Sequence, residues 1–305
     1  MARSAVSGDR QLPKHVQFAP ITEATDHRFA FIAPLPLMQS WRKWKLRHDN
    51  YWLLLAHKIL EDPTGWGEYF AGSDAFSTPL SQFVMMDNSL IELGYPLPSK
   101  ELAEAAQIVS ADALVLPDVM YDGLGTTELA IEAARRIRES GELSAAVGLM
   151  AVVQGHSYEE IGRCALDIKA ALEDDLRYWC VPRCLTNDPE LRSRVVVCKW
   201  LRSKWPEMPI HLLGFSDNLS DDFRCAQMDG VMGIDSAMPI WLGQQGHLLP
   251  PTPPRAGHNK YGSRPKMFWE FERVEMDMIN NVWTCRRWVR GEQSWIGGSS
   301  RNYAY

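Results

Sequence analysis

Short, almost continuously apolar runs recur along the chain and alternate with stretches of helical periodicity. The runs cover residues 29–34, 83–87, 113–118, 147–155, 176–182, 210–215 and 230–235. Strands that are buried on both faces read as continuous apolar runs, and such strands are typical of parallel sheets covered by helices. The pattern therefore predicts a parallel sheet built from repeated strand–helix units.

Helical stretches lie between these runs, at residues 100–111, 126–141, 157–175 and 219–230. The third begins with Ser157 and Glu160 in the spacing of a capping box. Residues 51–60 fit either a strand or a helix and could supply an eighth strand. We therefore predict an α/β fold of the (β/α)8 TIM-barrel type, for which 305 residues suffice, with a doubly wound open sheet as the structural alternative.

Composition suggests three parts along the chain. We expect a flexible N-terminal segment over residues 1–20, the barrel over 21–250, and a helical, aromatic extension over 251–305. Residues 255–305 hold nine basic and five acidic residues, a net charge of +4; since the whole chain carries −6, the first 254 residues carry −10. The acidic body argues against strong nonspecific binding of nucleic acid, whereas the basic extension could contact it locally.

Neither a secretion signal nor a membrane span is evident. The first residues, MARSAVSGDRQLPKH, are not followed by the apolar core of a signal peptide. The longest apolar stretch, residues 29–38, contains two prolines and is too short to cross a bilayer. We expect a cytoplasmic protein with no membrane partner.

Polar side chains stand at the ends of several apolar runs. Asp87, Asp118, Gln154 and Asp235 each follow such a run. A single acid in this position is most simply a turn or cap residue. In a barrel, however, the carboxyl ends of all strands meet at one face, where active sites are built. Three acids and an amide converging there predict a functional site.

The residue types suggest a chemistry for that site. Two carboxylates on one rim suit cleavage of a glycosidic bond, one as nucleophile and one as general acid and base. A further acid and a glutamine could read the hydrogen-bonding edge of a purine-like base. Gly155 and Gly214 would let the backbone approach a flat ligand closely. His211 lies inside an apolar run and is interpreted as a packing or hydrogen-bonding residue.

Tryptophans flank two basic clusters, in residues 41–48 and 283–288. They are interpreted either as solvated helix faces or as a rim that contacts phosphates and stacks on bases. The candidate contacts to nucleic acid, including an arginine after the 176–182 run, are Arg42, Lys43, Lys45, Arg183, Arg286 and Arg287.

Five short motifs over residues 80–240 occur in a familiar order. They are MDNS, LPDV, VVQG, HLLG and GIDSAMP. In this order and spacing they resemble the tRNA-guanine transglycosylase superfamily, whose members are barrels that exchange a guanine for a 7-deazaguanine base.

The resemblance implies a role for each matched residue. Asp235 would be the nucleophile that attacks C1′ of the sugar, and Asp87 the general acid and base. Asp118 and Gln154 would bind the edges of the base, with Gly155 and Gly214 offering backbone groups. Ile91 and Leu213 would sandwich the base, and Val181 falls where backbone groups contact it.

Two departures from the tRNA enzymes refine the resemblance. Only Cys285 follows Asp235, so the Cys-x-Cys-x-x-Cys…His zinc site of those enzymes cannot form, and no metal or other cofactor is expected. Asn88 and Ser89 stand where those enzymes have Ser-Gly-Gly. Both departures resemble the phage-type branch, which inserts 7-deazaguanines into DNA. The implied partners are DNA and a free 7-deazaguanine base, and the implied location is the host cytoplasm if a phage encodes the protein.

Three other functions stay open. A zinc-free enzyme of the same class could act on tRNA. A noncatalytic protein on the same barrel could bind nucleic acid, although the presence of both Asp87 and Asp235 speaks against this. A glycoside hydrolase also places paired acids at a barrel rim.

Overall fold

The computed structural model describes residues 28–43, 51–71, 83–187, 191, 193–255, 258–261 and 264–292. Eight strands form one sheet in the order β1-β8-β7-β6-β5-β4-β3-β2, and every neighbouring pair is parallel. The strands are β1 Arg28–Phe31, β2 Tyr51–Leu55, β3 Phe83–Asp87, β4 Ala113–Val115, β5 Gly148–Val152, β6 Leu176–Pro182, β7 Ile210–Leu213 and β8 Val231–Ser236.

The sheet curls into a nearly closed barrel. Its two end strands, β1 and β2, lie against each other. The rings of Phe31 and Trp52 meet there edge to face with centroids 5.7 Å apart, and the Arg28 guanidinium lies 5.9 Å from the centroid of the Tyr51 ring. The strand order never reverses as it would in a doubly wound sheet. The predicted eight-stranded parallel arrangement is confirmed.

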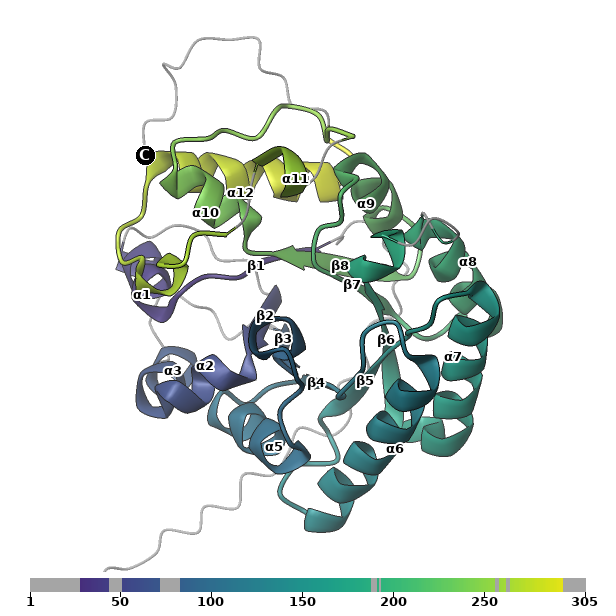
Figure 1. Cartoon of the computed structure of the whole chain (residues 1–305). Helices are drawn as coiled ribbons and strands as arrows, with labels where there is room; N and C mark the ends of the chain where they lie inside the picture. The colour runs from purple at the N-terminus through teal and green to yellow at the C-terminus, as the bar shows by residue number, and fades with distance from the viewer. Residues whose placement is uncertain are drawn as a thin grey trace, which may run out of the picture.

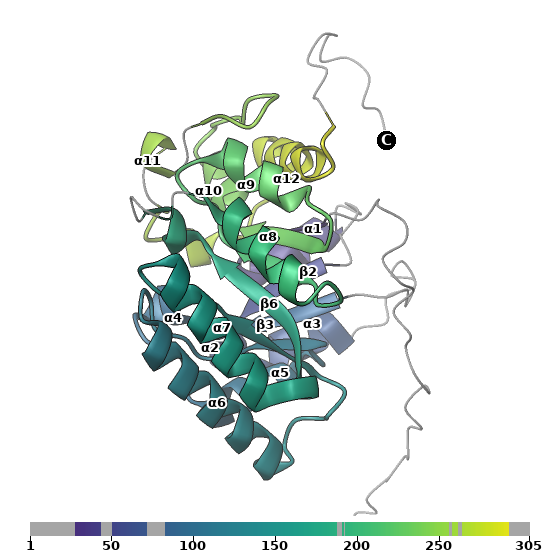
Figure 2. The ribbon, with the colours of Figure 1, turned by 90° about the vertical axis from the view of Figure 1, so that its right-hand side faces the viewer.

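Helices surround the strands on the outside, as the view of Figure 1 shows. The α-helices are α1 Leu35–Lys43, α2 Ala56–Glu61, α3 Pro63–Ala71, α4 Leu90–Leu93, α5 Ser99–Ile108, α6 Gly123–Ser140, α7 Tyr158–Leu172, α8 Arg194–Lys204, α9 Leu219–Ala226, α10 Met238–Gln244, α11 His258–Tyr261 and α12 Met276–Val289. Short 3-10 helices cover Glu173–Asp175, Arg183–Asn187 and Phe268–Glu270. In Figure 2 the arrowhead of β6 points to the side of the barrel on which α4 and α11 lie.

The ambiguous segment 51–60 contains both structures. Its first five residues form β2, which is buried throughout, and helix α2 begins directly afterwards at Ala56. The capping box at Ser157 was predicted correctly in its first half, because the Ser157 hydroxyl accepts a hydrogen bond from the Glu160 amide at 3.1 Å. The Glu160 carboxylate instead accepts from the amide of His156.

Apolar side chains fill the interior of the barrel near the amino ends of the strands. Along β2, Tyr51 and Leu53 face inward while Trp52 and Leu54 pack against the helices, as the alternation of a strand requires. The Tyr51 ring stacks on Phe83 with centroids 5.9 Å apart, and Phe83 meets Tyr178 edge to face at 5.5 Å. This packed layer is the floor beneath the polar side chains at the strand ends.

The described part of the C-terminal region shares the core of the barrel. Helix α12 packs along α10 and against β1 (Figure 1). Met278, Val282, Cys285 and Trp288 on α12 are buried in the same apolar cluster as the outer faces of the strands. Residues 264–289 therefore cover the barrel near β1 and β8 rather than standing apart from it. Within the described ranges, no helix has the length and apolar character that crossing a bilayer demands.

Candidate active site

A cavity of about 580 Å³ opens at the carboxyl ends of the strands. Most of the predicted base-site residues line it together: Asp87, Ile91, Asp118, Gln154, Leu213, Gly214 and Asp235. Arg183 lines it too. Residues from 32 to 264 contribute to its wall, so the barrel brings together side chains that are far apart in the sequence.

Asp87 ends strand β3 and faces the cavity. Its Oδ2 accepts a hydrogen bond from the Ser89 amide at 2.8 Å. Removal from solvent raises the pKa of the Asp87 carboxyl well above its usual range, and the nearby charges of Glu92, Asp235 and Asp118 raise it further against the opposing effect of the Ser89 amide. Asp87 is therefore suited to hold a proton and to donate it.

Asp235 lies on β8 and has a different environment. Its Oδ1 accepts a hydrogen bond from the Gly214 amide at 3.0 Å and lies 3.0 Å from Nε2 of His211. Gly214 has a φ of +68°, a backbone conformation that residues with a side chain rarely adopt. In this conformation its amide donates the hydrogen bond to Asp235. Both hydrogen bonds that described residues make to Asp235 reach the same oxygen, which leaves Oδ2 for a ligand in the cavity.

Asp118 is held between two amide side chains. Asn88 donates from Nδ2 to Oδ1 of Asp118 and Gln154 donates from Nε2 to Oδ2, each at 2.7 Å. Burial raises the pKa of the Asp118 carboxyl, and these two bonds partly offset the rise. The Gln154 carbonyl accepts from the Tyr121 amide at 3.0 Å, which fixes the orientation of the side-chain amide. Asn88 was given no role from sequence, although it directly follows Asp87.

Two predicted base-contact residues, Gly155 and Val181, stand outside the lining of this cavity, although both are in the described part of the chain. The Val181 side chain is fully buried, and its carbonyl accepts a hydrogen bond from Arg194 at 3.4 Å. Val181 thus lies behind the cavity wall, and the contact of its backbone with a ligand stays a prediction.

Arg264 is a cavity residue that sequence reasoning missed. It comes from the connection between β8 and α12, and its Nη1 lies 3.2 Å from Oε1 of Glu92. Its guanidinium lies 5.4 Å from the ring centroid of Phe268 and 5.3 Å from that of Trp269. The sequence placed Arg264 in a basic segment, but no local pattern distinguished it from the other cations there.

The cations predicted to touch nucleic acid have several environments. Arg42 lies over the Tyr69 ring, 4.2 Å from its centroid, and donates to the Tyr69 carbonyl at 3.0 Å. Lys43 is exposed at the end of α1. Lys45 lies outside the described residues.

The α12 pair differs from the prediction. Arg286 is 5% exposed and packs beside Trp283, so its guanidinium is not available at the surface as expected. Arg287 lies 3.8 Å from the carboxylate of Glu292. The reason is helical periodicity: Arg286 falls one residue after Cys285, on the face of α12 that packs against the barrel.

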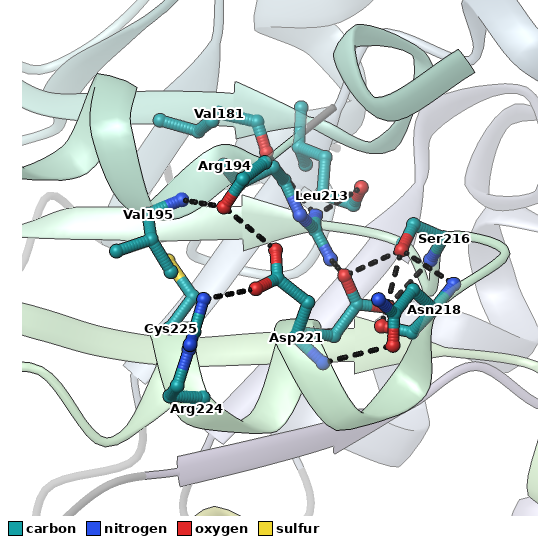
Figure 3. Close-up of polar contacts among 12 residues, drawn as sticks. Val181, Arg194, Val195, Leu213, Ser216, Asn218, Asp221, Arg224 and Cys225 are labelled. Carbon is teal, nitrogen blue, oxygen red and sulfur yellow. Dashed lines mark hydrogen bonds and ion pairs between the residues drawn. The ribbon is translucent and has the colours of Figure 1, made fainter. Parts of the chain in front are cut away.

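A buried ion pair lies behind the cavity wall, and Figure 3 shows the polar contacts around its arginine, Arg194. Arg194 on α8 donates to Asp222 on α9 at 2.5 Å, and both side chains are fully buried. Arg194 also donates to the carbonyl of Leu213 at 3.2 Å, as it does to that of Val181. Asp222 accepts from the amide and the hydroxyl of Ser216 at 2.6 and 2.7 Å. The pair thereby ties the ends of β6 and β7 and fixes the loop that carries Gly214.

The arrangement suits chemistry at a carbon bonded to a leaving group. It brings together Asp235, to which described residues donate only at Oδ1, Asp87, whose pKa is raised well above its usual range by burial, and a third acid, Asp118, with two amide partners. Within the described ranges, no three His, Cys, Asp or Glu side chains are grouped to hold a metal ion. No protein-family model matches this sequence, and no curated protein sequence matches it either.

Proposed function

We propose that the protein is a DNA guanine transglycosylase, which exchanges a guanine in DNA for a 7-deazaguanine base through a covalent Asp235–sugar intermediate. The observation that carries the proposal is the contrast between Asp87 and Asp235 across one cavity. A carboxyl with a raised pKa, such as Asp87, can act as the general acid, while a second carboxyl in the same cavity acts as the nucleophile.

The first half-reaction removes the guanine. Oδ2 of Asp235 attacks C1′ as the bond between C1′ and the base nitrogen breaks, and Asp87 donates its proton to the departing guanine. The products are neutral guanine, an ionised Asp87 and an ester between Asp235 and the sugar. The raised pKa of Asp87 supports this assignment, because the first step needs a protonated acid.

The second half-reaction reverses the same steps with the new base. The ionised Asp87 takes the proton from the ring nitrogen of the incoming 7-deazaguanine. That nitrogen attacks C1′ and displaces Asp235, which becomes a free carboxylate again. The cycle returns both acids to their starting states without a cofactor or a net redox change.

Base recognition is assigned to the deeper part of the cavity. Asp118 and Gln154 present a carboxylate and an amide that would exchange their mutual hydrogen bond for bonds to the edge of a guanine. Ile91 and Leu213 line the same cavity and would contact the faces of the ring. A guanine in a duplex cannot reach a barrel mouth while stacked, so the target nucleotide must flip out.

Two arginines at the cavity support a polyanionic substrate. Arg183 follows β6, and Arg264 reaches Glu92 near the end of β3. In the circular order of strands, β6 lies across the barrel from β2 and β3. A DNA strand that enters between the two guanidinium groups would have positive charge on both sides, which favours binding of its phosphates.

The test is a base-exchange assay with the full chain. Labelled guanine or a labelled 7-deazaguanine is incubated with protein and with duplex DNA or bulk tRNA, and the label in precipitated polymer is counted. We expect label in DNA, and a loss of about a thousandfold or more in Asp235→Asn. The matched control is Asp229→Asn, because the Asp229 side chain is 88% exposed.

Each other outcome selects a different function. Label in tRNA would replace DNA as the substrate. No label in either polymer with a folded protein would reject base exchange in favour of a binding protein or a sugar enzyme. We further propose that no zinc is resident, since only Cys285 follows Asp235; a metal assay giving about one zinc per chain would contradict this.

A further inference from the structure

We propose that Tyr51 and His211 are positioning residues that hold Asp235 in one orientation through a hydrogen-bonded chain, so that only Oδ2 faces the ligand. The inference rests on the proposed nucleophilic role of Asp235. It assigns a function to two buried polar side chains that the exchange mechanism does not otherwise use.

The chain of contacts crosses the interior of the barrel. The Tyr51 hydroxyl on β2 lies 2.7 Å from Nδ1 of His211 on β7. Nε2 of the same imidazole lies 3.0 Å from Oδ1 of Asp235 on β8. Tyr51 and His211 are 1% and 0% exposed, so no solvent competes for these bonds. The Gly214 amide converges on the same Oδ1, and the two donors together fix the plane of the carboxylate.

The chemistry of Tyr51 and Asp235, at the two ends of the chain, decides which group donates in each hydrogen bond. Burial raises the pKa of the Tyr51 hydroxyl well above its usual range, so it keeps its proton and donates to Nδ1. A neutral imidazole that accepts at Nδ1 carries its own proton on Nε2. That proton points at Asp235. His211 therefore acts as a donor to the carboxylate and not as a base.

A glycine on β8 makes room for this chain. Gly233 precedes Asp235 by two residues and faces the same side of the strand. A Cβ at Gly233 would lie 2.4 Å from the Arg28 carbonyl oxygen and 2.7 Å from Cε1 of Tyr51, both closer than real Cβ contacts, so the glycine accommodates the backbone of β1 as well as the Tyr51 ring. Phe83 holds the other side of the Tyr51 ring by stacking. The Gly-Ile-Asp sequence thus combines the nucleophile with the space that its support requires.

Holding one oxygen matters for the displacement at C1′. A carboxylate that rotates freely presents Oδ2 to the sugar only part of the time, and positioning of reacting groups contributes strongly to rate. Groups that orient a reacting ligand from behind typically contribute 10- to 100-fold when removed, by analogy with the supporting partners of metal ligands, which gives about 10-fold as the expected scale.

Nitrogen NMR of the imidazole tests the chain without any substrate. In the wild-type protein we expect the His211 signals of the Nε2–H tautomer, assigned by their absence in His211→Gln. In Tyr51→Phe we expect the Nδ1 shift to move as its donor is lost. A wild-type imidazole protonated on Nδ1 would overturn the inference, and this readout holds even if the protein exchanges no base.

Single-turnover kinetics then test the effect on Asp235. Tyr51→Phe should slow formation of the covalent sugar intermediate about 10-fold while the Kd for DNA is unchanged. His211→Gln, which keeps a donor, should retain more activity than His211→Phe. Phe83→Leu is the packing control, because it alters the stack on Tyr51 and leaves the hydroxyl in place. Equal rates in wild type and Tyr51→Phe would overturn the positioning role.

Discussion

Two groups of buried or half-buried carboxylates in this protein differ in whether a cation lies beside them. Asp222, behind the cavity wall, meets the Arg194 guanidinium at 2.5 Å and both donors of Ser216. Among the described residues, the donors to Asp87 and Asp118 at the cavity are all amides, and the two acids lie near each other. Burial raises the pKa of all three carboxyls, but only at Asp222 does a cation oppose the rise. A buried carboxylate that is paired with a cation becomes costly when the cation is removed, whereas carboxyls with strongly raised pKa values cluster at functional sites.

Removing Arg194, the cation beside Asp222, should have the largest effect on the free energy of unfolding. Arg194→Met leaves Asp222 buried and unpaired, and we expect a loss of about 3 to 5 kcal/mol in the free energy of unfolding, measured by urea denaturation. The double variant with Asp222→Leu should recover much of the loss. Arg224→Met is the control, because Arg224 is 68% exposed beside Asp221 and should cost at most about 1 kcal/mol. A small effect of Arg194→Met would remove the distinction between the two groups.

Asp87→Asn, at a carboxyl without a cation beside it, should lower activity while raising stability. We expect base exchange to fall about a thousandfold, the scale of a lost general acid. The folded state binds the Asp87 proton more tightly than the unfolded state does, so this group reduces stability as the pH rises above the usual range of an aspartate. The substitution should therefore raise Tm more at about pH 8 than at about pH 4. A lower Tm at both values would contradict this sign.

Glu92→Gln should shift the pH dependence of the reaction. The charge of Glu92 helps to raise the pKa of Asp87, and the substitution also removes the carboxylate that faces Arg264. Both changes lower the pKa of Asp87. We expect the alkaline limb of single-turnover guanine release to move to lower pH, because Asp87 loses its proton earlier. Glu61→Gln, on an exposed pair with Lys58, should leave the limb in place. A shift of the alkaline limb to higher pH would contradict the view that the Glu92 charge raises the pKa of Asp87.

The smallest expected effect concerns the cavity cations. Arg264→Gln should weaken binding of duplex DNA and reduce the slope of log K against log salt by about 0.9, the value for one phosphate contact. Arg287→Gln should leave the slope unchanged, since Arg287 lies on α12 and does not line the cavity. An unchanged slope in Arg264→Gln would mean that this arginine only pairs with Glu92.

Much of this architecture could be predicted from the sequence. Continuous apolar runs fixed seven strands, and the polar residues at their ends identified Asp87, Asp118, Gln154 and Asp235, which the structure brings to one cavity. These features are local, so they can be read from short stretches. The division of residues 51–60 could not, because its strand and its helix are both apolar and both buried at their junction.

What the sequence did not indicate depends on contacts between distant residues. Arg194 and Asp222 are 28 positions apart, and Tyr51 and His211 are 160 apart. No spacing rule connects such pairs before the barrel is formed. Arg286 was misplaced for a different reason: charge was taken to indicate exposure, although the helical period of the surrounding apolar residues places it on the packed face.

The junction of β1 and β2 gives the barrel a seam. Within the described residues these two strands share no backbone ladder, whereas every other junction has one; ring contacts such as that of Phe31 with Trp52 join them. The seam is where the barrel should open most readily, with fast amide hydrogen exchange at its edges. Tyr51 lies on that edge, and its hydroxyl contacts His211 on β7 inside the barrel. Local opening of the seam would withdraw the Tyr51 hydroxyl from His211. The free energy of this opening would then also set how often Asp235 is held in its reactive orientation.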